Sequence, residues 1–207
     1  MGLGHVIVLN GAPRSGKSTI ANRIINIFAG PWVNIGVDAF QAATPERLRP
    51  GIGLRPGGER PDLEPFVISA YRGLYACVAS LSREGVNVAV DVGHHESYSR
   101  PLGILQRSAH QLEGLPVLFV GVRCPIEAAM ARRAHESPVG APYLTATPGV
   151  PIPEPVRRWQ REVHRPGIYD LEVDTDALST EACTDAIRTR LALGPGDAFA
   201  RIVAGKV

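Results

Sequence analysis

Short apolar runs and stretches of helical periodicity alternate along the chain. Runs of this length that are rich in β-branched residues predict buried strands, and they cover residues 5–9, 32–37, 86–92, 116–122 and 168–173. Apolar side chains that recur every three or four residues predict helices with one buried face. Such helices are expected over residues 20–28, 63–83, 99–114, 126–135, 156–164 and 179–191. The pattern therefore indicates an α/β domain.

Two long segments interrupt this pattern. Residues 44–62 are rich in glycine, proline and arginine, a composition that cannot form a regular element. We predict a substrate-side loop over about residues 41–64, with a loop of no function as the alternative. Residues 137–155 contain repeated prolines, which favour an extended and semi-rigid segment. We predict a lid over about residues 132–165 that excludes water from a bound nucleotide.

The most specific motif lies between the first apolar run and the first helix. It reads G-x-x-x-x-G-K-S-T and predicts a P-loop. Its glycines let backbone N–H groups point at phosphate oxygens, Lys17 can reach the β- and γ-phosphates, and the Ser18 hydroxyl can ligate Mg²⁺. The alternative is a glycine turn with a solvated lysine. This alternative is disfavoured, because the strand before the motif and the helix after it would then occur there by chance. We expect the whole motif to bind ATP: Gly11, Ala12, Pro13, Arg14, Ser15, Gly16, Lys17, Ser18 and Thr19.

Two acids follow predicted strands. Asp38 ends the second apolar run, and ligands of open α/β sheets bind at the carboxyl ends of strands. Asp38 is therefore predicted to be the catalytic base that receives a proton from an attacking hydroxyl. The alternative is the N-cap of the next helix, and the two roles can coexist. Asp91 sits near the end of the third run, where a Walker B acid holds Mg²⁺ directly or through water.

Several neighbours of these acids are candidates for contact with the substrate. They are Phe40, Val92 and His94, together with Asp38 and Asp91. Metal binding by His94 and His95 is disfavoured, because adjacent side chains diverge, and substrate contact or solvation is expected instead. Tyr71 lies on the apolar stripe of the helix over 63–83 and is expected in the core, with substrate contact as the alternative.

Two arginines precede the proline-rich segment. Arg132 and Arg133 lie on the predicted helix over 126–135. Arginines beside a phosphate site can bind phosphoryl oxygens bidentately and offset charge in the transition state, so both are expected to contact ATP and Arg132 to act in catalysis. A solvated basic face is the alternative.

Composition narrows the classes of partner. A chain of 207 residues fits one domain over residues 1–207, and its net charge of +2 argues against a nucleic-acid partner held by electrostatics. No apolar run is long enough to predict a membrane span, and the first strand begins too early to leave room for a signal peptide. Three widely spaced cysteines suit the reduced cytoplasm. Assembly into a homo-oligomer stays open.

Several stretches together resemble the chloramphenicol phosphotransferase family of P-loop kinases. Besides the P-loop, they are Val8–Gly11, Gly36–Asp38, Val90–Val92, Val120–Cys124 and, after His164, Tyr169–Thr175. The resemblance implies a three-layer P-loop NTPase fold around a five-stranded parallel sheet of the nucleotide-kinase type. It also implies ATP-dependent phosphorylation of a hydroxyl on a small molecule. In that family Asp38 would match the proposed base, Asp91 would lie beside the substrate, and Arg132 would touch the phosphates.

The chain departs from the family pattern at two positions. Gly93 stands where a bulky residue is expected beside the substrate, and Glu136 stands where a second lid arginine is expected. The acceptor is therefore expected to be an antibiotic or a related natural product, without commitment to chloramphenicol. A zeta-toxin-like kinase of a nucleotide sugar and a non-kinase P-loop ATPase or binding module are the alternatives. A GTPase is disfavoured, because Lys206 is the only lysine besides Lys17 and no guanine motif can be formed.

Overall fold

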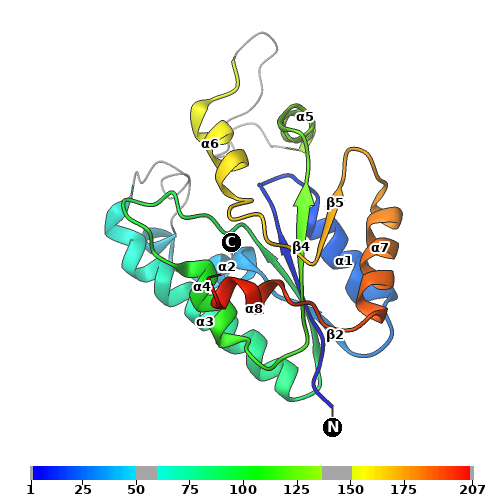
Figure 1. Ribbon diagram of the computed structural model, residues 1–207. Helices are drawn as coiled ribbons and strands as arrows, with labels where there is room; N and C mark the ends of the chain where they lie inside the picture. Colours follow the sequence, from blue (N-terminus) through cyan, green and yellow to red (C-terminus); the bar gives the residue numbers. More distant parts are fainter. Residues whose placement is uncertain (1, 50–59, 137–150, 206–207) are drawn as a thin grey trace.

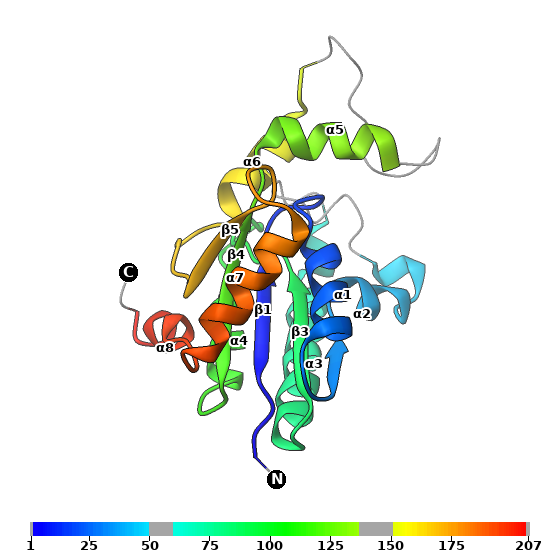
Figure 2. The same ribbon diagram turned by 90° about the vertical axis from the view of Figure 1, so that its right-hand side faces the viewer.

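Five parallel strands form the centre of the molecule (Figures 1 and 2). The structure is a computed structural model that describes residues 2–49, 60–136 and 151–205. In chain order the strands are β1 (Val6–Asn10), β2 (Trp32–Asn34), β3 (Asn87–Val92), β4 (Val117–Arg123) and β5 (Leu171–Asp174). Their order across the sheet is β2-β3-β1-β4-β5, and each pair is parallel. The predicted α/β fold and its five-stranded parallel sheet are therefore confirmed.

The central strand β1 sets the position of the candidate site. Asn10, its last residue, pairs with Val92 of β3 and with Gly121 of β4. Since parallel strands end at the same edge of a sheet, the loops that follow β1, β3 and β4 all leave from that edge. The P-loop, the His94 turn and the start of α5 are thereby brought together.

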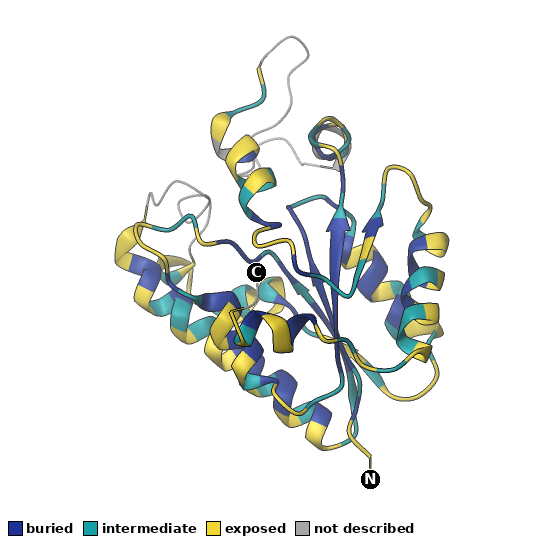
Figure 3. Ribbon diagram, in the orientation of Figure 1, coloured by how far each residue is buried: buried dark blue, intermediate teal, exposed yellow. Residues whose placement is uncertain are grey.

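Helices cover both faces of the sheet, and the two cores lie between these layers (Figure 3). One face packs against α1 (Lys17–Ile27) and α7 (Thr180–Ala192), and the other packs against α3 (Glu64–Arg83), α4 (Ile104–Gln111) and α8 (Ala198–Val203). Side chains along β1 alternate between the faces, so that Ile7 and Leu9 enter the first core while Val6 and Val8 enter the second. This is the expected three-layer arrangement.

The remaining helices lie beyond the carboxyl edge of the sheet or beside it. They are α2 (Val37–Ala42), α5 (Ile126–Glu136), α6 (Glu154–Glu162) and the 3-10 turns Glu46–Leu48 and Pro61–Leu63. Figures 1 and 2 show α5 and α6 beyond the ends of β4 and β5. The middle parts of the predicted substrate-side loop and lid, residues 50–59 and 137–150, lie outside the described residues. Within the described part of the chain, no helix is long and apolar enough to cross a membrane.

Two sequence expectations about elements were wrong. The second strand ends at Asn34, so Asp38 lies in the first turn of α2 and not at the end of a strand. The helix expected over 99–114 begins only at Ile104, because the Glu96 carboxylate accepts the N–H groups of residues 102, 103 and 104 at 2.8–3.0 Å and defines its start. Beyond residue 191, where the sequence predicts no element, α8 places the ring of Phe199 4.9 Å from the ring of Phe119.

Candidate active site

The backbone of the P-loop is shaped to enclose an anion. Gly16 has φ of 90°, and Arg14 has φ of 68°, a left-handed conformation that is uncommon for a residue with a side chain. At Gly11 a β-carbon would lie 2.4 Å from the carbonyl oxygen of Val122, so only glycine fits against β4. Successive backbone N–H groups in such a turn, followed by the start of α1, form a phosphate-binding concavity.

Lys17, Ser18 and Asp91 form a compact polar cluster at the start of α1. The Lys17 ammonium donates to the carbonyl oxygen of Ala12 at 2.8 Å and lies 3.7 Å from Asp91 Oδ1. The Ser18 hydroxyl donates to Asp91 Oδ2 at 2.5 Å. Burial lowers the pKa of Lys17, while Asp91 and Asp38 oppose that change. A hydroxyl beside a carboxylate is a donor set that fits Mg²⁺, which prefers oxygen ligands.

Asp38 faces this cluster from α2. Burial raises the pKa of Asp38, and the nearby Asp91 carboxylate raises it further, whereas Lys17 and Arg14 lower it. The mutual effect of Asp38 and Lys17 on their pKa values is what a shared site of the predicted base and the P-loop lysine requires. The alternative role as a helix N-cap is wrong, because Gly36 occupies that position and Asp38 follows it in the first turn.

A pocket opens between α2 and α3, next to Asp38. It is lined by Val37, Phe40, Gln41, Thr44, Phe66, Val67, Ala70, Tyr71 and Leu74. Phe40 is thus the predicted substrate residue that the structure brings to this pocket. Tyr71 lines the pocket, and burial raises the pKa of its phenol, with the Asp91 and Asp38 carboxylates adding to the effect. It also packs against the hydrophobic core, as its place on an apolar helical stripe predicts.

Val92 and His94 lie in the protein interior, and neither lines the pocket between α2 and α3. Each is only 2% exposed. His94 Nε2 lies 2.6 Å from the Tyr75 hydroxyl, and its backbone N–H donates to Asn10 Oδ1 at 2.7 Å. Burial lowers the pKa of His94 to about 3, so the ring is neutral. The solvation expected for the histidine pair was wrong, since His95 is also buried and stacks on Tyr98 with ring centroids 4.3 Å apart.

Arg132 reaches the P-loop from α5. Its guanidinium donates to the Thr175 carbonyl oxygen at 2.8 Å, to Thr175 Oγ1 at 2.9 Å and to the Arg14 carbonyl oxygen at 3.3 Å. Thr175 Oγ1 in turn donates to the Ser15 carbonyl oxygen at 2.8 Å. Arg132 and Thr175 therefore support the P-loop backbone, a role that the sequence did not predict for Thr175. Arg133 lies on the same helix, but its side chain is outside the described residues.

Comparisons with known proteins agree with this geometry. A family model described as chloramphenicol phosphotransferase-like protein matches residues 4–192. A search of curated proteins found no match to the chain.

Solved structures of similar fold include three that match over nearly their whole length. The tunicamycin resistance protein of Deinococcus radiodurans is 16% identical, with a TM-score of 0.60 over 91% of this chain and 95% of that chain. A sugar kinase from Janibacter sp. HTCC2649 is 20% identical, with a TM-score of 0.57 over 92% and 95%. The Mycobacterium tuberculosis APS kinase in complex with AMPPNP and APS is 15% identical, with a TM-score of 0.55 over 93% and 99%. At these identities the likeness shows the fold alone.

The chain also matches part of a larger protein. It covers only 37% of a chain in the structure of the Pnkp1/Rnl/Hen1 RNA repair complex, with a TM-score of 0.46.

Proposed function

Because the chain belongs to the chloramphenicol phosphotransferase-like family of P-loop kinases, we propose that it transfers the γ-phosphoryl group of ATP to a hydroxyl of a small molecule. The observation that carries this proposal is the position of Asp38. It lies on the helix that lines the pocket between α2 and α3, and it is electrostatically coupled to Lys17 and Asp91 beside the P-loop. The proposed base, the proposed phosphate-binding lysine and the proposed acceptor pocket would thus lie close enough together for phosphoryl transfer.

The P-loop would hold the nucleotide. Its backbone N–H groups and the start of α1 would bind the phosphates, and Lys17 would move from the Ala12 carbonyl oxygen to the β- and γ-phosphates. Ser18 and Asp91 would hold Mg²⁺, which offsets the charge of the phosphate oxygens when it is bound. The cost of burying the Lys17 ammonium is then offset by anions on the substrate.

Asp38 would prepare the acceptor for attack. The hydroxyl oxygen forms a bond to the γ-phosphorus, the bond between that phosphorus and the bridging oxygen breaks, and ADP leaves. Asp38 accepts the proton that the hydroxyl loses. A carboxylate with a raised pKa is a stronger base than an exposed one, which suits it to this transfer. Arg132 and Arg133 are proposed to offset charge on the transferred group, with Arg132 exchanging a backbone carbonyl for a phosphoryl oxygen.

The lining of the pocket favours a neutral acceptor with an apolar body. Its described lining is apolar except for the uncharged polar side chains of Gln41, Thr44 and Tyr71. A nucleotide sugar carries a diphosphate, and a site for it needs cationic or N–H groups near that charge. We therefore propose an alcohol on an antibiotic or a related natural product as the acceptor.

A screen for ATP consumption tests this function. The protein would be incubated with MgATP and individual antibiotics, nucleosides and nucleotide sugars, and the products would be identified by mass spectrometry. The proposal expects a mass gain of one phosphoryl group on a neutral alcohol. Phosphorylation of a nucleotide sugar would replace the proposed substrate class, and acceptor-independent ATP hydrolysis throughout the screen would favour an ATPase. Lys17→Ala is the matched control, because it removes the ammonium at the P-loop.

A further inference from the structure

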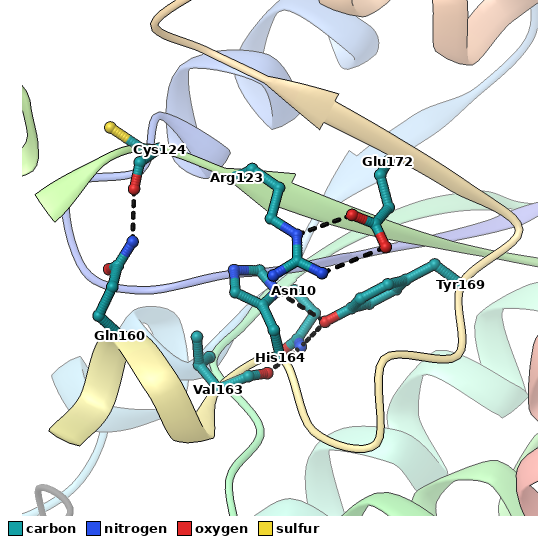
Figure 4. Close-up of polar contacts among 8 residues, drawn as sticks. All are labelled: Asn10, Arg123, Cys124, Gln160, Val163, His164, Tyr169 and Glu172. Carbon is teal, nitrogen blue, oxygen red and sulfur yellow. Dashed lines mark hydrogen bonds and ion pairs between the residues drawn. The ribbon is translucent and has the colours of Figure 1, made fainter. Parts of the chain in front are cut away.

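Asn10 occupies a buried junction one residue before the P-loop. Its side chain is 1% exposed, yet its amide joins three separate segments of the chain. Asn10 Nδ2 donates to the Val163 carbonyl oxygen at 2.7 Å and to the Tyr169 hydroxyl at 2.9 Å, and Oδ1 accepts the N–H of His94 at 2.7 Å. Figure 4 shows the first two of these contacts at the end of α6. The amide therefore uses both its donors and its acceptor.

The segment at the end of α6 is fixed to the sheet by further contacts. The Gln160 amide donates to the Cys124 carbonyl oxygen, just after β4, and His164 Nδ1 lies 2.8 Å from the Tyr169 hydroxyl (Figure 4). The Tyr169 ring lies so close to β4 that a β-carbon at Gly121 would be 2.8 Å from it. These contacts hold Tyr169 and the end of α6 at the carboxyl edge of the sheet.

The same helix also contacts the turn that follows β3. The Trp159 ring lies 5.3 Å from the His95 ring, in an edge-on arrangement. A β-carbon at Gly93 would lie 3.2 Å from the Gly11 carbonyl oxygen and 3.6 Å from Trp159 Nε1, so a larger side chain at residue 93 would meet the P-loop backbone and the indole. The turn over 93–95 and α6 thus touch through Trp159 and are bridged by Asn10.

We propose that Asn10 is a positioning residue for phosphoryl transfer, which holds α6 and the 93–95 turn in fixed places relative to the P-loop. The inference rests on the proposed function, since the turn follows Asp91 and borders the site of the reaction. Asn10 itself binds no phosphate through its side chain, whose polar atoms are all engaged within the protein. It acts through the 93–95 turn on one side and through α6 on the other.

The variant Asn10→Asp separates these roles. A carboxylate has the shape of the amide and can still accept the His94 N–H, but it cannot donate to the Val163 carbonyl oxygen. The direct bond from residue 10 to the end of α6 is then lost while the bond to the turn is kept. The control is Tyr169→Phe, which removes the hydroxyl that contacts Asn10 and His164 but leaves the bonds from Asn10 to Val163 and His94 in place.

Kinetics and nucleotide binding give the first measurement. The phosphate-binding groups stay intact in Asn10→Asp, so we expect the Kd for MgATP to change less than about threefold. We expect kcat for phosphorylation of the acceptor found in the screen to fall by about 100-fold, the scale of a displacement of about 1 Å in a reacting geometry. Tyr169→Phe should stay within about fivefold of the wild type. Three outcomes would overturn the proposal. In Asn10→Asp these are an unchanged kcat or a loss of ATP affinity as large as the loss of kcat, and in Tyr169→Phe it is a fall in kcat as large as in Asn10→Asp.

Hydrogen exchange gives a second measurement that needs no acceptor. In Asn10→Asp the amides of residues 160–164 should exchange faster than in the wild type. The amides of residues 93–96 should also exchange faster, although the bond to the His94 N–H is retained. Faster exchange at residues 160–164 alone would show that Asn10 does not link the two segments. If the wild type used no ATP, the proposed function would fail, and this exchange experiment would still decide whether the link exists.

Discussion

The buried, neutral ring of His94 predicts a specific dependence of stability on pH. The ordinary pKa of 6.5 for histidine is lowered to about 3 in the folded protein, chiefly by burial and then by the neighbouring His95. His94 Nδ1 has no hydrogen-bond partner among the described residues, so nothing there stabilises a charged ring. A group whose pKa is lowered on folding contributes stability above its unfolded pKa, and this contribution is lost as the pH falls toward the folded pKa.

The size of the effect follows from the difference between the two pKa values. At pH 5 the pH is about 1.5 units below the pKa of the histidine in the unfolded protein, so that ring is charged, whereas the ring in the folded protein is still neutral. Each unit of pKa difference corresponds to about 1.4 kcal/mol. Acidification from pH 7.5 to pH 5 should therefore cost the folded state about 2 kcal/mol through His94 alone. His164, with its pKa lowered to about 4 by burial and by Arg123, adds a loss in the same direction.

The variant His94→Gln isolates this contribution. Glutamine does not titrate in this range and can still accept a hydrogen bond from the Tyr75 hydroxyl, and the contribution of His164 cancels in the comparison. Urea unfolding at pH 7.5 and pH 5, followed by circular dichroism, would give the free energy of unfolding for both proteins. We expect the wild type to lose about 2 kcal/mol more than the variant. Equal losses would show that His94 is accessible to protons in the folded state, and the argument from burial would fail.

Three further predictions concern the base, the arginine and the C-terminal helix. Asp38→Asn should keep ATP binding and lower kcat by about 100-fold or more, and an unchanged kcat would exclude Asp38 as the base. Because the pKa of Asp38 is raised, the wild-type rate should fall on acidification at a higher pH than it would with an ordinary carboxyl. Arg132→Gln should lower kcat by about 100-fold and raise the KM for ATP, since it frees Thr175 and removes a charge; steady-state kinetics that match the wild type would refute this role. Phe199→Ala should lower the free energy of unfolding by about 3 kcal/mol in urea, and a loss below about 1 kcal/mol would mean that α8 contributes little to the core.

The sequence predicted the parts of the site that local patterns encode. Lys17 and Ser18 follow a glycine loop with a strand before it and a helix after it, and Asp91 ends an apolar run, so their meeting follows from parallel strand topology. The position predicted for Asp38, at the end of a strand, is wrong, and its role as the base stays a prediction. The strand before it stops at Asn34, and the first turn of α2 presents the carboxylate.

Other features could not be predicted because they depend on contacts between distant residues. The side chain of Asn10 is bonded to Val163, which is 153 positions away in the chain, so the motif beginning at Gly11 gives no sign of it. The six residues of α8 are too few to show a period, and their helix is stabilised by burial against the sheet. The sequence predicts substrate contact or solvation for His94, because a polar residue after a strand gives no sign that Tyr75 on α3 lies against it.

Transfer of labelled phosphate by the wild type and by Lys17→Ala tests the central claim most directly. With [γ-³²P]ATP, Mg²⁺ and the acceptor found in the screen, the wild type should yield a labelled acceptor in a one-to-one ratio with ADP. Lys17→Ala should fold normally, as judged by circular dichroism and thermal unfolding, and yield no labelled acceptor above background, since we propose Lys17 as the cation that contacts the β- and γ-phosphates. Transfer by the folded variant at the wild-type rate, or ADP formed by the wild type without any labelled acceptor, would contradict the account.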